Sequence, residues 1–246
     1  MENSFDYGQL NFDLPHDVVQ LPSNGIFYKN KKKSIKVGYL TGSDENILMG
    51  NSKDVVISLL RSKIYEHDLR PEDMLEGDIE AILIFLRNTS FGPEMEMTLT
   101  DPVTKQTFKH TVVLDRLPLN SGTQPNSEGF FVTTLPKSKD EIKLKPLNYG
   151  ELLEIQKIID SYPEFRVAPK VTLRLQKEIV EVNGKADKSE ISKYIDQMPI
   201  ADSKYIRKFM NDNEPRLDLR QQVIAPSGEK LTFNVGFGAE FFRPFF

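Results

Sequence analysis

One pattern of residues occurs twice in this chain of 246 residues. Ile35-Lys36-Val37, followed by Leu40, recurs as Ile142-Lys143-Leu144, followed by Leu147, at a shift of 107 positions (142 − 35). Four further residues recur in one ungapped register at a shift of 124 positions (202 − 78): Asp78, Ile82, Phe85 and Pro102 recur as Asp202, Ile206, Phe209 and Pro226. This self-similarity predicts two similar units from an internal duplication, the second with 17 more residues (124 − 107).

Within each half, hydrophobic periodicity predicts a strand followed by helices, and a β-hairpin at the end. In the first half, Asp54 is the expected cap of one helix, and Gly77-Asp78 opens the next, with Asp78 as its expected cap. In the second half, two capping-box patterns mark helix starts: Asn148 with Glu151, and Asp187 with Glu190. The predicted fold class is therefore α+β.

The hairpin turns are expected at Asp101-Pro102 and at Pro226-Ser227-Gly228, because alternating apolar residues lie on both sides of each turn. Residues 164–182 fit either a helix or a strand.

Local composition divides the chain into five parts. Residues 1–22 lack clear periodicity and read as an N-terminal arm, which precedes the first α+β half at 23–119. Residues 120–129 are rich in turn formers and read as a linker to the second half at 130–240. Residues 241–246 form an aromatic C-terminal tail. Whether the two halves form one domain stays open.

Overall composition excludes several classes of protein. Lys and Arg number 32 against 36 Asp and Glu, so no strong net charge attracts nucleic acid or an anionic membrane. The chain has no cysteine, which excludes disulfides and thiolate chemistry and fits a reducing cytosol. Its first residues are neither basic nor apolar, and the longest apolar run is Ala81 to Leu86, so we expect no signal peptide and no membrane span.

No established catalytic or cofactor motif is present, and we expect neither a cofactor nor a metal. His16, His67 and His110 are far apart in sequence. The acidic stretch 66–80 lacks the spacing of a calcium loop, and a solvated acidic surface is the preferred interpretation. The alternative is a cation-dependent hydrolase that uses these carboxylates.

A second alternative is a nucleic-acid-binding adaptor that acts through the basic run from Lys29 to Lys36. No aromatic-rich strand accompanies these lysines, and they lie where a turn between two strands is expected. A role in solubility is therefore preferred.

The candidate partner-binding residues are aromatic. Four phenylalanines at the chain end would leave apolar surface in water, at about 25 cal/mol per Å². They either fold back into a groove between the two halves or anchor in another subunit, with Arg243 at the rim. The candidates are Phe241, Phe242, Arg243, Phe245 and Phe246 in the tail, together with Phe27 and Tyr28 near the start.

Several segments resemble the baseplate proteins of T4-like bacteriophages. They are Leu21-Pro22-Ser23-Asn24-Gly25-Ile26-Phe27-Tyr28, Gly77-Asp78 with Leu86-Arg87-Asn88-Thr89-Ser90-Phe91-Gly92, and Gly236-Phe237-Gly238-Ala239-Glu240-Phe241-Phe242-Arg243-Pro244. Members of such families often carry Cys-Pro-x-Cys in the hairpin turns. Here those turns read Asp101-Pro102-Val103-Thr104 and Ala225-Pro226-Ser227-Gly228, so the resemblance implies no zinc site.

The resemblance implies a non-enzymatic role in building the baseplate hub. The protein would be a hub subunit or an assembly chaperone, made late in infection, that binds other hub and tail proteins in a symmetric complex. It would be found in the host cytoplasm during assembly, and in the virion tail baseplate if it is retained. The hairpins, the N-terminal arm and the aromatic tail are the expected contact regions.

Overall fold

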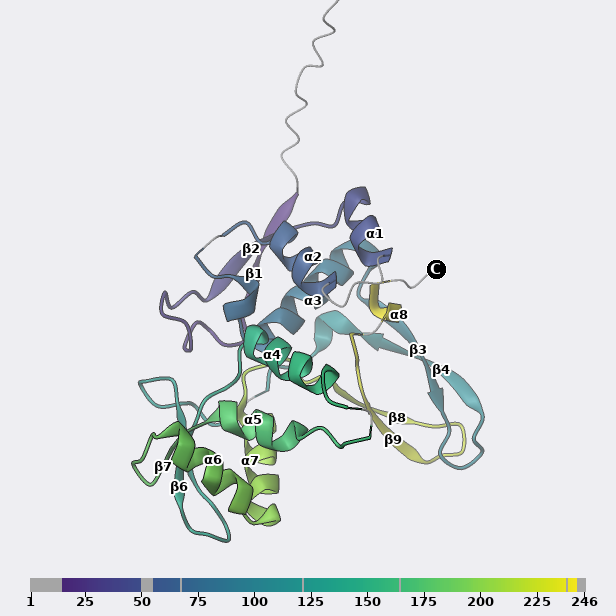
Figure 1. Ribbon diagram of the computed structural model, residues 1–246. Coiled ribbons are helices and arrows are strands. Elements are labelled where there is room, and N and C mark those ends of the chain that lie inside the picture. The colour runs from purple at the N-terminus through teal and green to yellow at the C-terminus, as the bar shows by residue number, and fades with distance from the viewer. Residues whose placement is uncertain are drawn as a thin grey trace, which may run out of the picture.

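The computed structural model describes residues 15–49, 55–66, 68–120, 122–163, 165–237 and 239–242. Its strands pair in antiparallel hairpins and in one three-stranded sheet, β5-β6-β7. Helices pack on β1–β2 and on the three-stranded sheet, whereas β3–β4 and β8–β9 extend away from the helices (Figure 1). The predicted α+β fold class is confirmed. The elements are β1 (His16–Gln20), β2 (Ser34–Gly38), α1 (Gly42–Met49), α2 (Val55–Lys63), η1 (Pro71–Asp73), α3 (Glu76–Phe91), β3 (Glu94–Thr100), β4 (Thr107–Val113), η2 (Leu114–Arg116), β5 (Phe131–Thr134), β6 (Glu141–Leu144), α4 (Tyr149–Asp160), α5 (Lys170–Glu178), β7 (Ile179–Val182), α6 (Lys188–Gln197), α7 (Ile200–Asn213), β8 (Arg220–Ile224), β9 (Lys230–Asn234) and α8 (Ala239–Phe242).

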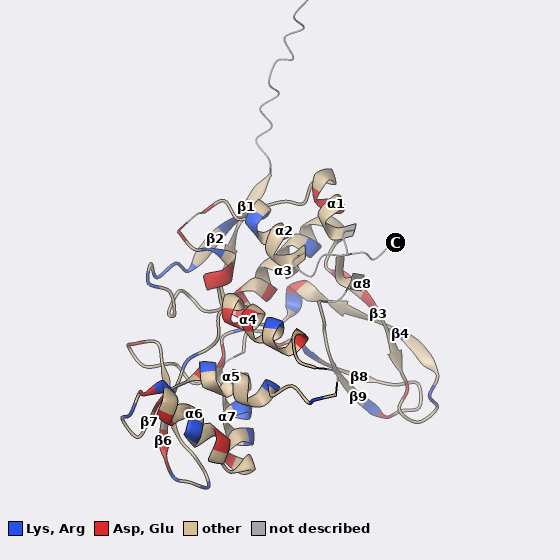
Figure 2. Ribbon diagram, viewed as in Figure 1, with Lys and Arg blue, Asp and Glu red and all other residues tan. Residues whose placement is uncertain are grey.

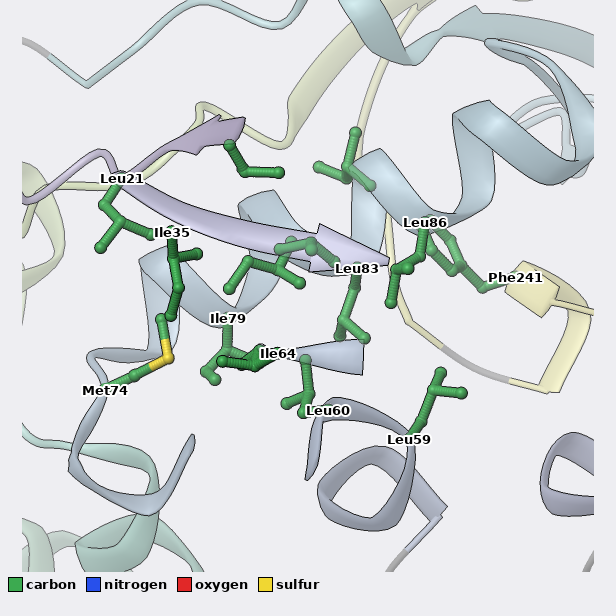
Figure 3. Packing of buried hydrophobic residues seen from close by; sticks show 14 of the residues in the cluster. Leu21, Ile35, Leu59, Leu60, Ile64, Met74, Ile79, Leu83, Leu86 and Phe241 are labelled. Atoms are coloured by element: carbon green, nitrogen blue, oxygen red, sulfur yellow. The ribbon is translucent and has the colours of Figure 1, made fainter. Parts of the chain in front are cut away.

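The first hydrophobic core surrounds α3, whose apolar residues are buried on several sides (Figure 3). A helix that is apolar nearly all round is stable only inside a protein, so α3 becomes the centre of this core. Strands β1 and β2, helix α2 and the hairpin β3–β4 pack around it. Fully buried side chains of this core include Ile35, Leu59, Leu60, Met74, Ile82 and Leu86.

The second core lies between the sheet β5-β6-β7 and helices α5, α6 and α7. Alternate residues of β6 face it, because Ile142 and Leu144 are buried while Glu141 is exposed. Helices α6 and α7 contribute residues at helical spacing, Ile191 with Ile195 and Ile206 with Met210.

The two cores contact each other through aromatic and close backbone packing. Phe27 packs against both cores, and its ring centroid lies 5.9 Å from that of Phe131. Gly77 of α3 lies against Pro215, and a Cβ at this position would overlap the carbonyl oxygen of that residue. Only glycine therefore permits this approach.

The boundaries between the predicted parts differ from those in the structure. Residues 16–20 were assigned to an N-terminal arm, but they form β1 and pair with β2. Val235 lies in the predicted second half, and Phe241 and Phe242 lie in the predicted tail, yet all three belong to the first core. The predicted linker 120–129 is held at Asn120, whose backbone N–H donates to the carbonyl of Arg216 (2.8 Å). The described C-terminal residues of the chain therefore pack on the first half.

Local predictions agree with the structure in most places. Asn148 and Glu151 form the predicted capping box of α4, Asp187 caps α6, and both hairpins are present. The ambiguous residues 164–182 contain α5 and β7. The prediction that Asp78 caps a helix is wrong: it is the third residue of α3 and is buried. Asp54 lies outside the described residues.

Candidate interaction surfaces

The segment from the end of α4 to the start of α5 exposes an unusual amount of apolar surface. It carries five of the twelve large apolar side chains that are exposed among the described residues. Phe165 is 85% exposed and Val167 is 95% exposed. Single exposed apolar side chains are common on protein surfaces, but a group of them on one segment is typical of an interaction site. We define Ile158, Tyr162, Phe165, Val167 and Val171 as the α4–α5 surface.

Two backbone hydrogen bonds lie within the described part of this segment. Arg166 N donates to the carbonyl of Pro163 (2.9 Å), and Lys170 N donates to the carbonyl of Ala168 (2.8 Å). Pro163 and Pro169 further restrict the backbone, because a proline ring fixes its own φ. Two hydrogen bonds and two prolines therefore restrict the described backbone next to Phe165 and Val167.

Of the described charged residues within 157–170, three are basic and one, Asp160, is acidic. Lys157, Arg166 and Lys170 are exposed, and no acidic side chain of the described chain forms an ion pair with them. The guanidinium of Arg166 lies 5.8 Å from the ring centroid of Phe165. Figure 2 shows that basic and acidic residues are otherwise interspersed over both halves, in agreement with the nearly balanced composition.

The hairpins β3–β4 and β8–β9 extend side by side to one edge of the molecule (Figure 1). Asp101, in the first turn, accepts hydrogen bonds through Oδ1 from Val103 N (2.9 Å) and Thr104 N (3.1 Å), and through Oδ2 from Ser227 N (2.9 Å) in the second turn. Desolvation raises the pKa of Asp101, but these backbone donors outweigh it and lower the pKa to about 2. A carboxylate thus joins the two turns, which contain no thiolate.

Tyr28, predicted as a partner contact, is buried within the chain. Its hydroxyl donates to Asp78 Oδ2 and accepts from Leu75 N (3.0 Å). Burial and the neighbouring Asp78 raise the pKa of Tyr28. Phe27 is partly buried between the two cores. Both residues connect parts of this chain.

The aromatic tail is described only as far as Phe242. Phe241 is fully buried and Phe242 is nearly so, and Figure 3 shows Phe241 directed at Leu86 of α3. Of the two environments considered for these rings, the structure places them within the chain. They pack on the first core and not in a groove between the halves. Arg243, Phe245 and Phe246 lie outside the described residues.

The described carboxylates of the acidic stretch 66–80 form ion pairs or hydrogen bonds with other residues of this chain. Asp68 pairs with Lys32 (2.6 Å), Glu72 with Arg61, and Glu80 with Arg216. Asp78 accepts hydrogen bonds from Ser23 N (2.9 Å) and Ser23 Oγ (2.6 Å) as well as from Tyr28. Among the described residues, no group of three or more His, Cys, Asp or Glu is arranged to hold a metal ion.

The basic run lies in the loop between β1 and β2, as predicted, except for Lys36, which lies in β2. Lys32 forms ion pairs with Asp68 and Glu66, and Lys31 Nζ donates to the carbonyl of Ile26 (3.0 Å). Two of its lysines are therefore used in holding the loop. Of the histidines, His16 lies against Tyr65 and His110 against Phe233, while His67 is outside the described part.

Buried charges lie between α5, the end of α7 and α3. Arg174 Nε donates to Glu178 Oε1 (2.6 Å), and Arg174 Nη2 lies 3.7 Å from Glu214 Oε1. Burial raises the pKa of Glu214 to about 7 and also raises the pKa of Glu178, although Arg174 opposes both shifts. Two carboxylates thus share one guanidinium, which makes this cluster sensitive to pH.

A family model described as T4 bacteriophage base plate protein matches residues 18–242 of the chain. The chain belongs to the T4 bacteriophage base plate protein family. Comparison with curated proteins and with solved structures gives no match. The matched range of this baseplate protein runs from β1 to α8, so it contains the α4–α5 surface and both hairpins.

None of the described helices of this baseplate protein is long and apolar enough to cross a bilayer. Sequence reasoning overlooked its α4–α5 surface. The available signal was a pair of apolar residues, Phe165 and Val167, between Pro163 and Pro169 in a stretch without clear periodicity.

Proposed function

We propose that this chain is a non-enzymatic protein of the baseplate hub. It acts in assembly of the hub by binding other hub proteins. Membership of the baseplate family supports a role in the phage tail. The observation that carries the binding role is the α4–α5 surface, where Phe165 and Val167 are exposed beside two backbone hydrogen bonds. The chain presents a preformed contact surface to the hub proteins, so they lose less conformational freedom on association.

Two forms of this role are testable, a subunit that stays in the tail and an assembly factor that leaves it. The experiment combines quantitative mass spectrometry of purified virions with affinity capture of the full chain from infected cells. The variant Phe241→Ala is not a suitable control bait. Its ring is buried, so its loss would destabilise the whole chain. An unrelated phage protein carrying the same tag is the control bait.

A fixed copy number in virions identifies a hub subunit. Captured hub proteins together with virions that lack the chain identify an assembly factor. A chain that is absent from virions and captures no tail protein above the control bait contradicts the proposed function in both forms.

A further inference from the structure

The α4–α5 surface has the composition of a protein-binding hot spot. Binding energy at interfaces is concentrated in a few aromatic and arginine side chains, surrounded by apolar contacts. Here Phe165 and Arg166 are adjacent in sequence, with the guanidinium over the ring, and Val167 follows. Tyr162 and Ile158 extend the apolar area along the end of α4.

The charges of this surface indicate the chemistry of its partner. Lys157, Arg166 and Lys170 are exposed and form no ion pair with the described chain. By contrast, the nearby acidic residue Asp160 accepts a hydrogen bond from Gln156 Nε2 (2.7 Å). That hydrogen bond leaves the charge of Asp160 in place, and the sequence has Glu164 next to Phe165, so residues 157–170 contain three basic and two acidic residues and have a net charge of +1. An interface that buries Arg166 without a carboxylate would leave a desolvated cation, which is unfavourable.

We infer that the α4–α5 surface docks into an apolar recess on a different baseplate protein, with acidic side chains at the rim of that recess. Phe165 and Val167 enter the recess, and Arg166 pairs with a rim carboxylate. This inference rests on the proposed function and adds to it the contact surface and the chemistry of the partner.

The restricted backbone of this segment favours strong binding. Because Arg166 N and Lys170 N are already hydrogen-bonded and two prolines limit the backbone, this segment loses less conformational entropy on docking than an unrestrained loop would. Loss of Phe165 or reversal of the charge on Arg166 is therefore expected to weaken binding at least about 30-fold, the typical effect at a hot spot.

The test measures binding of the full-length chain to each of the other purified baseplate proteins of the same phage. Phe165→Ser and Arg166→Glu are compared with the wild type, and the dissociation constants are determined by isothermal titration calorimetry. Ile200→Ser and Lys188→Glu are matched controls, since Ile200 is 75% exposed and Lys188 is exposed in α6. All four variants should keep the wild-type urea midpoint, because the changed side chains lie at the surface.

The inference is supported if one baseplate protein binds the wild type and both controls, but binds Phe165→Ser and Arg166→Glu at least about 30-fold more weakly. Reversal of the rim carboxylate on that partner to lysine should then restore binding of Arg166→Glu. Binding that is unchanged in both surface variants contradicts the inference while leaving the proposed function in place. Loss in Phe165→Ser alone contradicts the acidic rim.

Two further measurements exclude other occupants. If analytical ultracentrifugation shows that the wild type self-associates and Phe165→Ser does not, the occupant is a second copy of the chain and the inference is wrong. If the wild type sediments with vesicles of phosphatidylglycerol and phosphatidylethanolamine and Phe165→Ser does not, the surface binds lipid. If the wild type binds no baseplate protein at all, the proposed function fails together with the inference.

Discussion

Asp78 and Asp202 have the same structural role although 124 positions separate them (202 − 78). Each is the third residue of its helix, α3 or α7, and each is fully buried. Asp78 accepts a hydrogen bond from Ser23 N, in the loop that joins β1 to β2. Asp202 accepts hydrogen bonds from Lys137 N (2.8 Å) and Ser138 N (2.9 Å), in the loop that joins β5 to β6. In both halves, a helix is thereby fixed to a strand connection.

This correspondence is what an internal duplication predicts. The two loops both begin with Leu-Pro, at Leu21 and at Leu135, and both leucines are buried. The second half differs by β7, which adds a third strand to its sheet. A common origin of the two halves stays a prediction, because similar hydrogen bonds can also arise independently.

Removal of the Asp202 carboxylate should destabilise the protein. Asp202→Ala leaves the N–H groups of Lys137 and Ser138 without their acceptor, and we expect the free energy of unfolding to fall by about 1–3 kcal/mol. Urea denaturation followed by circular dichroism measures this change. Asp196→Ala, at an exposed position of α6, is the control and should change stability by less than about 0.5 kcal/mol. Equal effects of the two substitutions would show that Asp202 does not hold the loop.

The coupling of the two hairpin turns should depend on ionised Asp101. Its pKa is lowered to about 2, so the folded state favours the carboxylate, and the stabilisation is present above the ordinary pKa near 3.8 and is lost as the pH falls through about 2. In Asp101→Ala, we expect the amide of Ser227 to exchange with solvent faster at neutral pH, as measured by NMR. Glu229→Ala, in the turn of β8–β9, should leave this exchange unchanged. Unaltered protection of Ser227 in Asp101→Ala would contradict the coupling.

Removal of a buried phenylalanine ring and removal of an exposed one should change the stability of the protein by different amounts. Phe241→Ala removes a fully buried ring from the first core, and we expect unfolding to become easier by about 3–5 kcal/mol. Phe165→Ala removes a ring that is 85% exposed and should change stability by no more than about 0.5 kcal/mol. Thermal and urea denaturation of both variants measure the contrast. A mild effect of Phe241→Ala would mean that its ring does not belong to the core in solution.

Features that depend on neighbouring residues could be predicted from the sequence, and those that depend on distant residues could not. The capping box of Asn148 and the hairpin turn at Pro226 are formed by residues a few positions apart, so their patterns are visible in the chain. Asp78 has the chemistry of a helix cap, but its partners Ser23 and Tyr28 lie 55 and 50 residues away. The local pattern therefore predicts the wrong role for Asp78.

The candidate site shows the same limit. Aromatic residues at the chain end were expected either inside the chain or at a partner, and nothing local distinguishes these environments. The structure places Phe241 against a core that the first half of the chain builds. Conversely, Phe165 lies between α4 and α5 in a stretch without periodicity, so no local pattern indicates that its ring is 85% exposed.

The stability of the protein should decrease as the pH rises from about 4.5 to about 7, with Glu214 as a principal cause. Burial raises the pKa of Glu214 from 4.5 to about 7 in the folded state, so between these values the folded protein binds more protons than the unfolded chain. The free energy of unfolding must then fall with rising pH, by at most about 1.4 kcal/mol per pH unit for one proton. The pKa values of Asp78, Glu80 and Glu178 are also raised and act in the same direction.

Glu214→Gln tests this assignment because glutamine cannot ionise and fills nearly the same volume. Arg174 keeps Glu178 as its partner in this variant. We expect urea midpoints of the variant to change less between pH 5 and pH 8 than those of the wild type, and its midpoint at pH 8 to be the higher of the two. Glu229→Gln, at an exposed position, should retain the wild-type dependence. If Glu214→Gln also retains it, the pH dependence comes from the other buried carboxylates, and Glu214 is ionised in the folded protein across this range.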